Sequence, residues 1–162
     1  MISFDPNLRP PLWNSLDDAK KQVLYGLDYC DILKISDNEI QWLTEEDDFT
    51  AGVNWIKERY PDIKLILVSM GKDGSRAYYA GGMTEVAARI NENTIETTGA
   101  GDTFCACVLH YVLEHGLEGL TDENLKEMLE FANSAASLIT TKKGALRVMP
   151  TKEEVEAYLN AK

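Results

Sequence analysis

The stretch Thr97-Thr98-Gly99-Ala100-Gly101-Asp102-Thr103-Phe104 runs directly into the segment Cys105 to Leu113, which has the pattern of a helix. A glycine-rich turn that opens a helix is a favourable anion site. Its backbone N–H groups point outward, and the helix dipole favours negative charge there. Gly99 and Gly101 also leave the backbone accessible to a ligand. The stretch therefore predicts a turn that binds phosphate.

Asp102 is an unusual residue for a turn that only holds phosphate. An aspartate at the start of a helix can be a simple N-cap. The flanking glycines favour a second interpretation, in which Asp102 takes a proton from an attacking hydroxyl while the turn holds a phosphoryl group in transfer. We expect Asp102 to be the base and the amides of Gly99, Ala100, Gly101 and Asp102 to stabilise the transferring charge. Phosphoryl transfer is the leading hypothesis.

Outward from this turn, strand and helix patterns alternate through the first half of the chain. Such alternation predicts an α/β fold with three layers and a mostly parallel sheet. We expect strands at 2–5, 31–36 and 63–69, and helical segments from the N-cap Ser15 to about Tyr29, at 38–43 and at 51–60, the last of them after a cap-like start at Thr44.

The second half begins with two strands, 75–80 and 83–90, which we expect to be antiparallel around Gly81-Gly82. Helices are predicted at 100–116, 121–140 and 152–160. We find no repeat, low-complexity stretch or internal linker, so the sequence predicts one domain over residues 1–162.

Composition excludes several classes of function. The chain has 162 residues, a hydrophobic fraction of 44% and a net charge of −11. The acidic balance argues against nucleic-acid binding, which favours a basic surface. No apolar run approaches the roughly 20 residues of a membrane helix. The first residues lack a signal-peptide pattern, and three cysteines are an odd number, so we expect a reducing, cytoplasmic location.

A second set of residues follows the apolar run 63–69. Ser69, Gly71 and Gly74 form a turn between that buried strand and the predicted hairpin. The turn is not a Walker A loop, because no Ser or Thr follows its Gly-Lys pair. Its position upstream of Asp102 favours a nucleotide contact over a simple turn.

These motifs occur together in one family and in the same order. The chain resembles the ribokinase-like (PfkB-type) carbohydrate kinases, whose second signature is [ST]-x-G-A-G-D, and in particular the fructokinase-like branch. The matching stretches are Asp5-Pro6-Asn7-Leu8-Arg9, Ser36-Asp37-Asn38-Glu39, Ser69 to Gly74, Thr97 to Asp102, Ala132-Asn133-Ser134-Ala135-Ala136 and Lys143-Gly144-Ala145.

The resemblance implies roles for individual residues. ATP would lie over Ser69 to Gly74 and near Asn133, although a packing role for Asn133 is an open alternative. Glu39 would hold Mg²⁺ through water, or would be a first-turn helix charge only. Carbonyls near Thr98 and Gly144 would bind a monovalent cation such as K⁺. Arg9 would face the sugar or the phosphates, or form a surface salt bridge.

The resemblance also implies an activity, the ATP-dependent phosphorylation of a sugar hydroxyl, with fructose converted to fructose 6-phosphate. Ketodeoxygluconate, ribose or a nucleoside are open alternatives. Family members are about twice this length, so we expect the chain to be the C-terminal half, without the N-terminal lid. A fragment or subunit that binds nucleotide without catalysis is the alternative. Its partners would be a second copy or a complementing N-terminal half.

Overall fold

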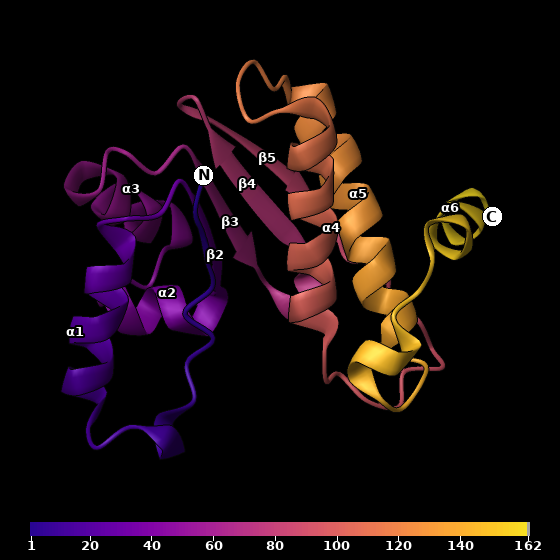
Figure 1. Cartoon of the computed structure of the whole chain (residues 1–162), viewed down its shortest axis with the longest axis horizontal. Helices are drawn as coiled ribbons and strands as arrows, with labels where there is room; N and C mark the ends of the chain where they lie inside the picture. Colours follow the sequence, from indigo (N-terminus) through magenta and orange to yellow (C-terminus); the bar gives the residue numbers. More distant parts are fainter. Residues whose placement is uncertain (162) are drawn as a thin grey trace. The chain divides into compact units, whose positions relative to one another are not determined.

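The computed structural model describes residues 1–161 and has an α/β fold, as the sequence predicted (Figure 1). Five strands form one mixed sheet in the order β1-β2-β3-β4-β5. The strands are β1 (Ser3–Phe4), β2 (Ile32–Ser36), β3 (Leu65–Ser69), β4 (Ser75–Tyr79) and β5 (Gly82–Val86). The α-helices are α1 (Leu16–Leu27), α2 (Asp37–Thr44), α3 (Phe49–Arg59), α4 (Ala100–His115), α5 (Asp122–Ile139) and α6 (Lys152–Asn160).

The chain divides into two compact units. The first contains Met1–Met70 and Tyr78–Gly81, and the second contains Gly71–Ala77 and the chain from Gly82 onward. Within the first unit, β1 pairs with β2 and β2 with β3, both in parallel. Ile32 is the register partner of Leu65.

The parallel strands are buried on both faces. Leu33 and Ile66 belong to the main hydrophobic core, and their neighbours Ile32 and Leu65, which point to the opposite face, are also fully buried. A strand that is covered on both sides is typical of a parallel sheet between two helical layers. The burial therefore supports the predicted three-layer architecture.

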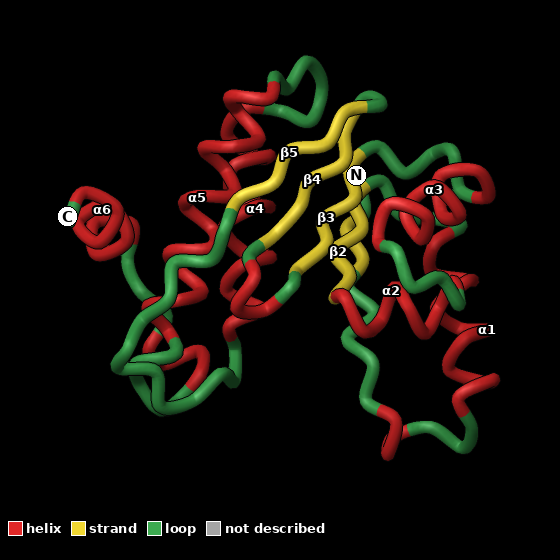
Figure 2. Tube along the Cα trace, turned by 180° about the vertical axis from the view of Figure 1, so that it is seen from behind, coloured by secondary structure: helices red, strands yellow, loops and turns green. Residues whose placement is uncertain are grey.

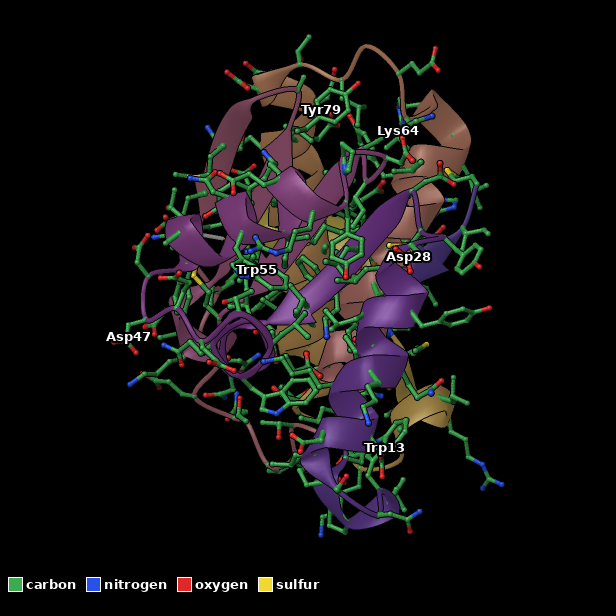
Figure 3. All side chains as sticks on the ribbon, turned by 90° about the vertical axis from the view of Figure 1, so that its left-hand side faces the viewer. Trp13, Asp28, Asp47, Trp55, Lys64 and Tyr79 are labelled. Carbon is green, nitrogen blue, oxygen red and sulfur yellow. The ribbon has the colours of Figure 1, made fainter. Side chains whose placement is uncertain are left out.

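The core of the first unit is built from α1, α2, α3, β2 and β3, which lie together in Figure 1. Trp55, on α3, is half-buried against this core, whereas Trp13, in the segment before α1, is 37% exposed. Figure 3 shows the two tryptophans well apart on this face of the chain. The helices of this core pack against β2 and β3. The motif residues 5–9 and 36–39 lie at the ends of β1 and β2.

The prediction that Thr44 starts the third helix is wrong. Thr44 is the last residue of α2, and its hydroxyl donates to the Ile40 carbonyl over 2.7 Å. The N-cap of α3 is Asp48, whose carboxylate accepts from the Ala51 N–H over 2.8 Å. A carboxylate or a hydroxyl can cap a helix, so composition alone did not distinguish the two residues.

In the second unit, α4 and α5 lie side by side in both views, and α5 also packs against β5 and α6 (Figures 1 and 2). The hairpin that joins β4 and β5 turns at Ala80 and Gly81, which are assigned to the first unit and both have positive φ (48° and 85°), a requirement of a type I′ turn. The strand predicted over 83–90 is present but ends earlier than expected, since β5 spans Gly82–Val86. The Val86 and Ala87 carbonyls accept from the Asn133 side chain, and a loop leads on to α4 (Figure 2).

No helix within residues 1–161 has the length and apolar character needed to cross a membrane.

Gly26 of α1 offers a test of how tightly the first unit is packed. Alanine usually stabilises a helix interior over glycine by about 1 kcal/mol. At Gly26, however, an added Cβ would lie 2.6 Å from two carbons of the Phe4 ring. We predict that Gly26→Ala lowers the free energy of unfolding by about 1–3 kcal/mol, measured by urea denaturation. In a Phe4→Leu background the same change is expected to cost less, and an equal cost in both backgrounds would contradict this account.

Candidate active site

The phosphate turn forms the start of α4, in the second unit. Gly99 is the N-cap, and its carbonyl accepts from the Thr103 N–H over 2.9 Å. The Ala100 N–H donates to the Thr97 carbonyl over 3.2 Å, so this amide already has an acceptor. The N–H groups of Gly101 and Asp102 have no acceptor within residues 1–161. These two amides are the donors that the turn offers to an anion.

Gly99 cannot be replaced without strain. Its φ is +84°, in the left-handed region that side chains disfavour. A Cβ built at this position would lie 3.3 Å from Ile139 Cδ1 and 3.4 Å from Ala145 Cα. The backbone of the turn therefore lies directly against the segment that follows α5, and the position of α4's first amides depends on that contact.

Asp102 is the third residue of α4 and is exposed. Among residues 1–161, no lysine, arginine or hydrogen-bond donor contacts its carboxylate. The carboxylate is thus accessible and adjacent to the two open amides of the turn. Chemically, this arrangement can accept a proton beside a bound anion.

Glu39 lies in the first unit, in the first turn of α2, and is 8% exposed. Its Oε1 accepts from the Leu8 N–H over 2.6 Å, and its Oε2 accepts from the Ser36 N–H and hydroxyl over 2.9 and 2.7 Å. The side chain therefore completes a capping box, which confirms its structural role. A carboxylate has about four acceptor sites, so room for a metal-bound water remains.

Lys34 belongs to the same region, and sequence reasoning missed it. It lies in β2, is 6% exposed, and its Nζ is 3.2 Å from Asp5 Oδ2. Burial raises the pKa of the Asp5 carboxyl above its ordinary value, and the Lys34 ammonium offsets part of that rise. The available signal was a single charged residue within the otherwise apolar run 32–35.

A cavity of about 390 Å³ lies over these residues in the first unit. Its lining consists of Asn7, Leu8, Arg9, Pro10, Lys34, Ser36, Asn38 and Glu39. Arg9 is exposed at this cavity, and its guanidinium donates to the carbonyls of Asn7 and Leu8 over 3.4 and 3.1 Å. Within the described chain Arg9 forms no salt bridge, so its charge is available to an anionic ligand.

The three residues expected to contact nucleotide have different surroundings. Ser69 ends β3 in the first unit, whereas Gly71 and Gly74 belong to the second. Gly71 has a φ of +56° and no atom within 4 Å of a built Cβ, which leaves its backbone open. At Gly74 a Cβ would lie 2.1 Å from the Val86 carbonyl oxygen. The close approach of the Val86 carbonyl therefore requires glycine at position 74, whether or not Gly74 also contacts a nucleotide.

Asn133, on α5, is 9% exposed and bonded within the protein. Its Oδ1 accepts from the Ser75 hydroxyl over 2.9 Å, and its Nδ2 donates to the Val86 and Ala87 carbonyls over 3.2 and 3.3 Å. The packing alternative for Asn133 is confirmed. The residue also lines a cavity of about 500 Å³ in the second unit.

The residues expected to hold metal ions are oxygen donors from loops and helix starts. Within residues 1–161 no three His, Cys, Asp or Glu side chains are grouped to hold a metal. Thr98 is exposed in the loop before α4, and Gly144 has a φ of +127°. Their backbone carbonyls have the chemistry that suits a monovalent cation.

The sequence profile of the family described as pfkB family carbohydrate kinase matches residues 1–152. The chain belongs to this family. It is 38% identical over 162 residues to probable fructokinase-2 of Arabidopsis thaliana and 37% identical to fructokinase-2 of Solanum lycopersicum. Each alignment covers 98% of this chain and 48% of the relative, so the chain spans about half the length of these relatives.

The fold is similar to that of a solved fructokinase double mutant from Vibrio cholerae O395. That crystal structure holds fructose, ADP and a potassium ion. The TM-score is 0.85 and the sequence identity is 27%, over 98% of this chain and 50% of the other.

The Asp5–Lys34 pair gives a test of the first unit's charged cluster. Lys34→Met would leave the partly buried Asp5 carboxylate without its partner. We predict a loss of about 3 kcal/mol in the free energy of unfolding at pH 7. The exposed Lys64, 4.0 Å from Asp31, is the matched control, and Lys64→Met is expected to cost about 0–1 kcal/mol (Figure 3).

The pH dependence of this loss has a definite sign. Without Lys34 the pKa of Asp5 in the folded state rises further above its unfolded value, so the folded state binds the proton more tightly. Stability then falls as the pH rises through the folded pKa, and the loss in Lys34→Met should be smaller in acid than at pH 7. A loss independent of pH, or no rescue by adding Asp5→Asn, would count against the buried pair.

Proposed function

We propose that the chain forms the phosphoryl-transfer part of an ATP-dependent sugar kinase that converts fructose to fructose 6-phosphate. The observation that carries this proposal is the exposed Asp102 carboxylate beside the open N–H groups of Gly101 and Asp102. Membership of the carbohydrate kinase family and the 37–38% identity to two plant proteins named as fructokinases support it.

In the proposed reaction, Asp102 accepts the proton of a primary sugar hydroxyl while the oxygen of that hydroxyl bonds to the γ-phosphorus of ATP. The bond between that phosphorus and the β,γ-bridging oxygen breaks, and ADP leaves with the electron pair. The Gly101 and Asp102 amides donate to the equatorial oxygens, where charge is greatest in transfer. Removing either donor would raise the barrier without changing the chemistry.

Other residues bind and orient the substrates. The open backbone at Gly71, together with Ser69 and Gly74, is proposed to lie along ATP. Asn133 is proposed to hold this region in place through its hydrogen bond with Ser75. Arg9 supplies positive charge for an anionic ligand. Mg²⁺ neutralises phosphate charge when bound, and Glu39 is proposed to accept from its waters. The carbonyls of Thr98 and Gly144 are proposed to hold K⁺.

A nucleotide-binding fragment or subunit without turnover is the alternative function. A kinase for ketodeoxygluconate, ribose or a nucleoside is the alternative within the same chemistry. We also propose a reducing, cytosolic setting, which the odd number of cysteines supports, and association with a second copy or with a complementing N-terminal half.

The direct test of the proposed function replaces Asp102, the proposed base. In an assay that couples ADP release to NADH oxidation, with Mg·ATP, K⁺ and fructose, Asp102→Asn should lower kcat roughly 100- to 10,000-fold. Binding of ATP and the thermal midpoint should change little, because the Asp102 carboxylate is exposed and has no ion pair or hydrogen bond within residues 1–161. Asp122→Asn is the matched control, since Asp122 is also an aspartate in the first turn of a helix, α5.

Two outcomes would contradict the proposal. Equal turnover by the Asp102→Asn and Asp122→Asn variants would remove Asp102 from the chemistry. ATP binding by the wild type without turnover on fructose, ribose, ketodeoxygluconate or a nucleoside would favour the nucleotide-binding subunit.

A further inference from the structure

The residue after α5, Thr140, is bonded to the chain that leads into the phosphate turn. Its carbonyl accepts from two consecutive backbone donors, the N–H groups of Ile95 and Glu96, over 2.9 and 3.1 Å. Thr140, which supplies the acceptor, is 7% exposed, whereas Ile95 is 58% exposed. The two bonds attach residues 95 and 96, a few positions before Gly99, to the end of a long helix.

The Thr140 hydroxyl adds a second connection. Its oxygen lies 2.9 Å from the Thr94 hydroxyl oxygen and 2.7 Å from the Ser137 carbonyl, while the Thr94 hydroxyl lies 2.8 Å from the Asn91 carbonyl. Each hydroxyl carries one proton, so two protons serve three contacts.

The turn itself rests on the same part of the chain. The space beside the Gly99 Cα is closed by Ile139, the last residue of α5, and by Ala145. Gly144 and Ala145 both have positive φ, 127° and 44°, which bends the chain after α5 back to this contact. The C-terminal end of α5 thus contacts the turn at Gly99 and the incoming chain at residues 94–96.

We propose that Thr140 is a positioning residue of the phosphate turn: through Thr94 and the backbone of Ile95 and Glu96, it fixes the chain that enters Gly99–Asp102. This inference rests on the proposed function, since the turn matters only if it holds phosphate. Thr140 itself touches neither Gly101 nor Asp102. Its effect on phosphoryl transfer is indirect and passes through the backbone that precedes them.

The chain offers a matched control at the next position. Thr141 makes the same type of bond as Thr140, from its hydroxyl back to a helix carbonyl, that of Leu138, over 2.8 Å. No bond joins Thr141 to the segment 91–96 among the described residues. Thr140→Val and Thr141→Val therefore remove equivalent hydroxyls. Of the two, only the Thr140 hydroxyl contacts Thr94, in the segment that leads to the turn. Thr140→Ser retains the hydroxyl.

The first readout is amide hydrogen exchange in the whole chain, which needs no activity. Thr140→Val should speed exchange at Ile95 and Glu96 about fivefold, the effect of losing one hydrogen bond, while Thr141→Val leaves it unchanged. Thr140→Ser should restore slow exchange. Equal exchange in the two valine variants would overturn the proposal.

The second readout is the kinetics with Mg·ATP and fructose. Misplaced donors act in the transition state, so Thr140→Val should lower kcat about tenfold with little change in the KM for fructose, and Thr140→Ser should recover it. A kcat equal to that of Thr141→Val would overturn the role in transfer. If the wild type shows no turnover, the proposed function fails, and the exchange comparison still decides whether Thr140 fixes the turn.

Discussion

The close packing of the Gly99 backbone against Ile139 and Ala145 is the constraint on which the second unit's site depends. A left-handed glycine, at which a Cβ would lie only 3.3 Å from Ile139, sets the position at which α4 begins. That start leaves the Gly101 and Asp102 amides without acceptors and the Asp102 carboxylate exposed beside them. A single backbone geometry therefore provides both the anion donors and the base.

The first unit uses a different principle, the burial of charge within a hydrogen-bonded network. Glu39 binds the N–H groups of Leu8 and Ser36, and Lys34 pairs with Asp5. These bonds join the segment after β1 to the end of β2, where parallel strands place their carboxyl ends at one edge. Such a network is costly to bury unless complete, so it holds the chain around Arg9 in one arrangement.

Local sequence patterns were sufficient for much of the fold. The apolar runs at 31–36 and 63–69 and the glycine turn at 99–101 identified β2, β3 and the start of α4. The predictions failed at positions whose structure depends on a residue far away in the sequence. β5 ends at Val86, where Asn133, 47 positions away, donates to the Val86 carbonyl, and no local signal marks that contact. Lys34 was overlooked because it is the one charged residue in an apolar strand, and its partner, Asp5, lies 29 positions earlier, just after β1.

The central claim is that this turn and its carboxylate move a phosphoryl group from ATP to a sugar alcohol. It is tested most directly by incubating the chain with γ-³²P-labelled ATP, Mg²⁺, K⁺ and fructose, and by locating the label in the products. The account predicts labelled fructose 6-phosphate together with unlabelled ADP. Label that stays in ATP, or appears only as inorganic phosphate whichever sugar is supplied, would contradict it.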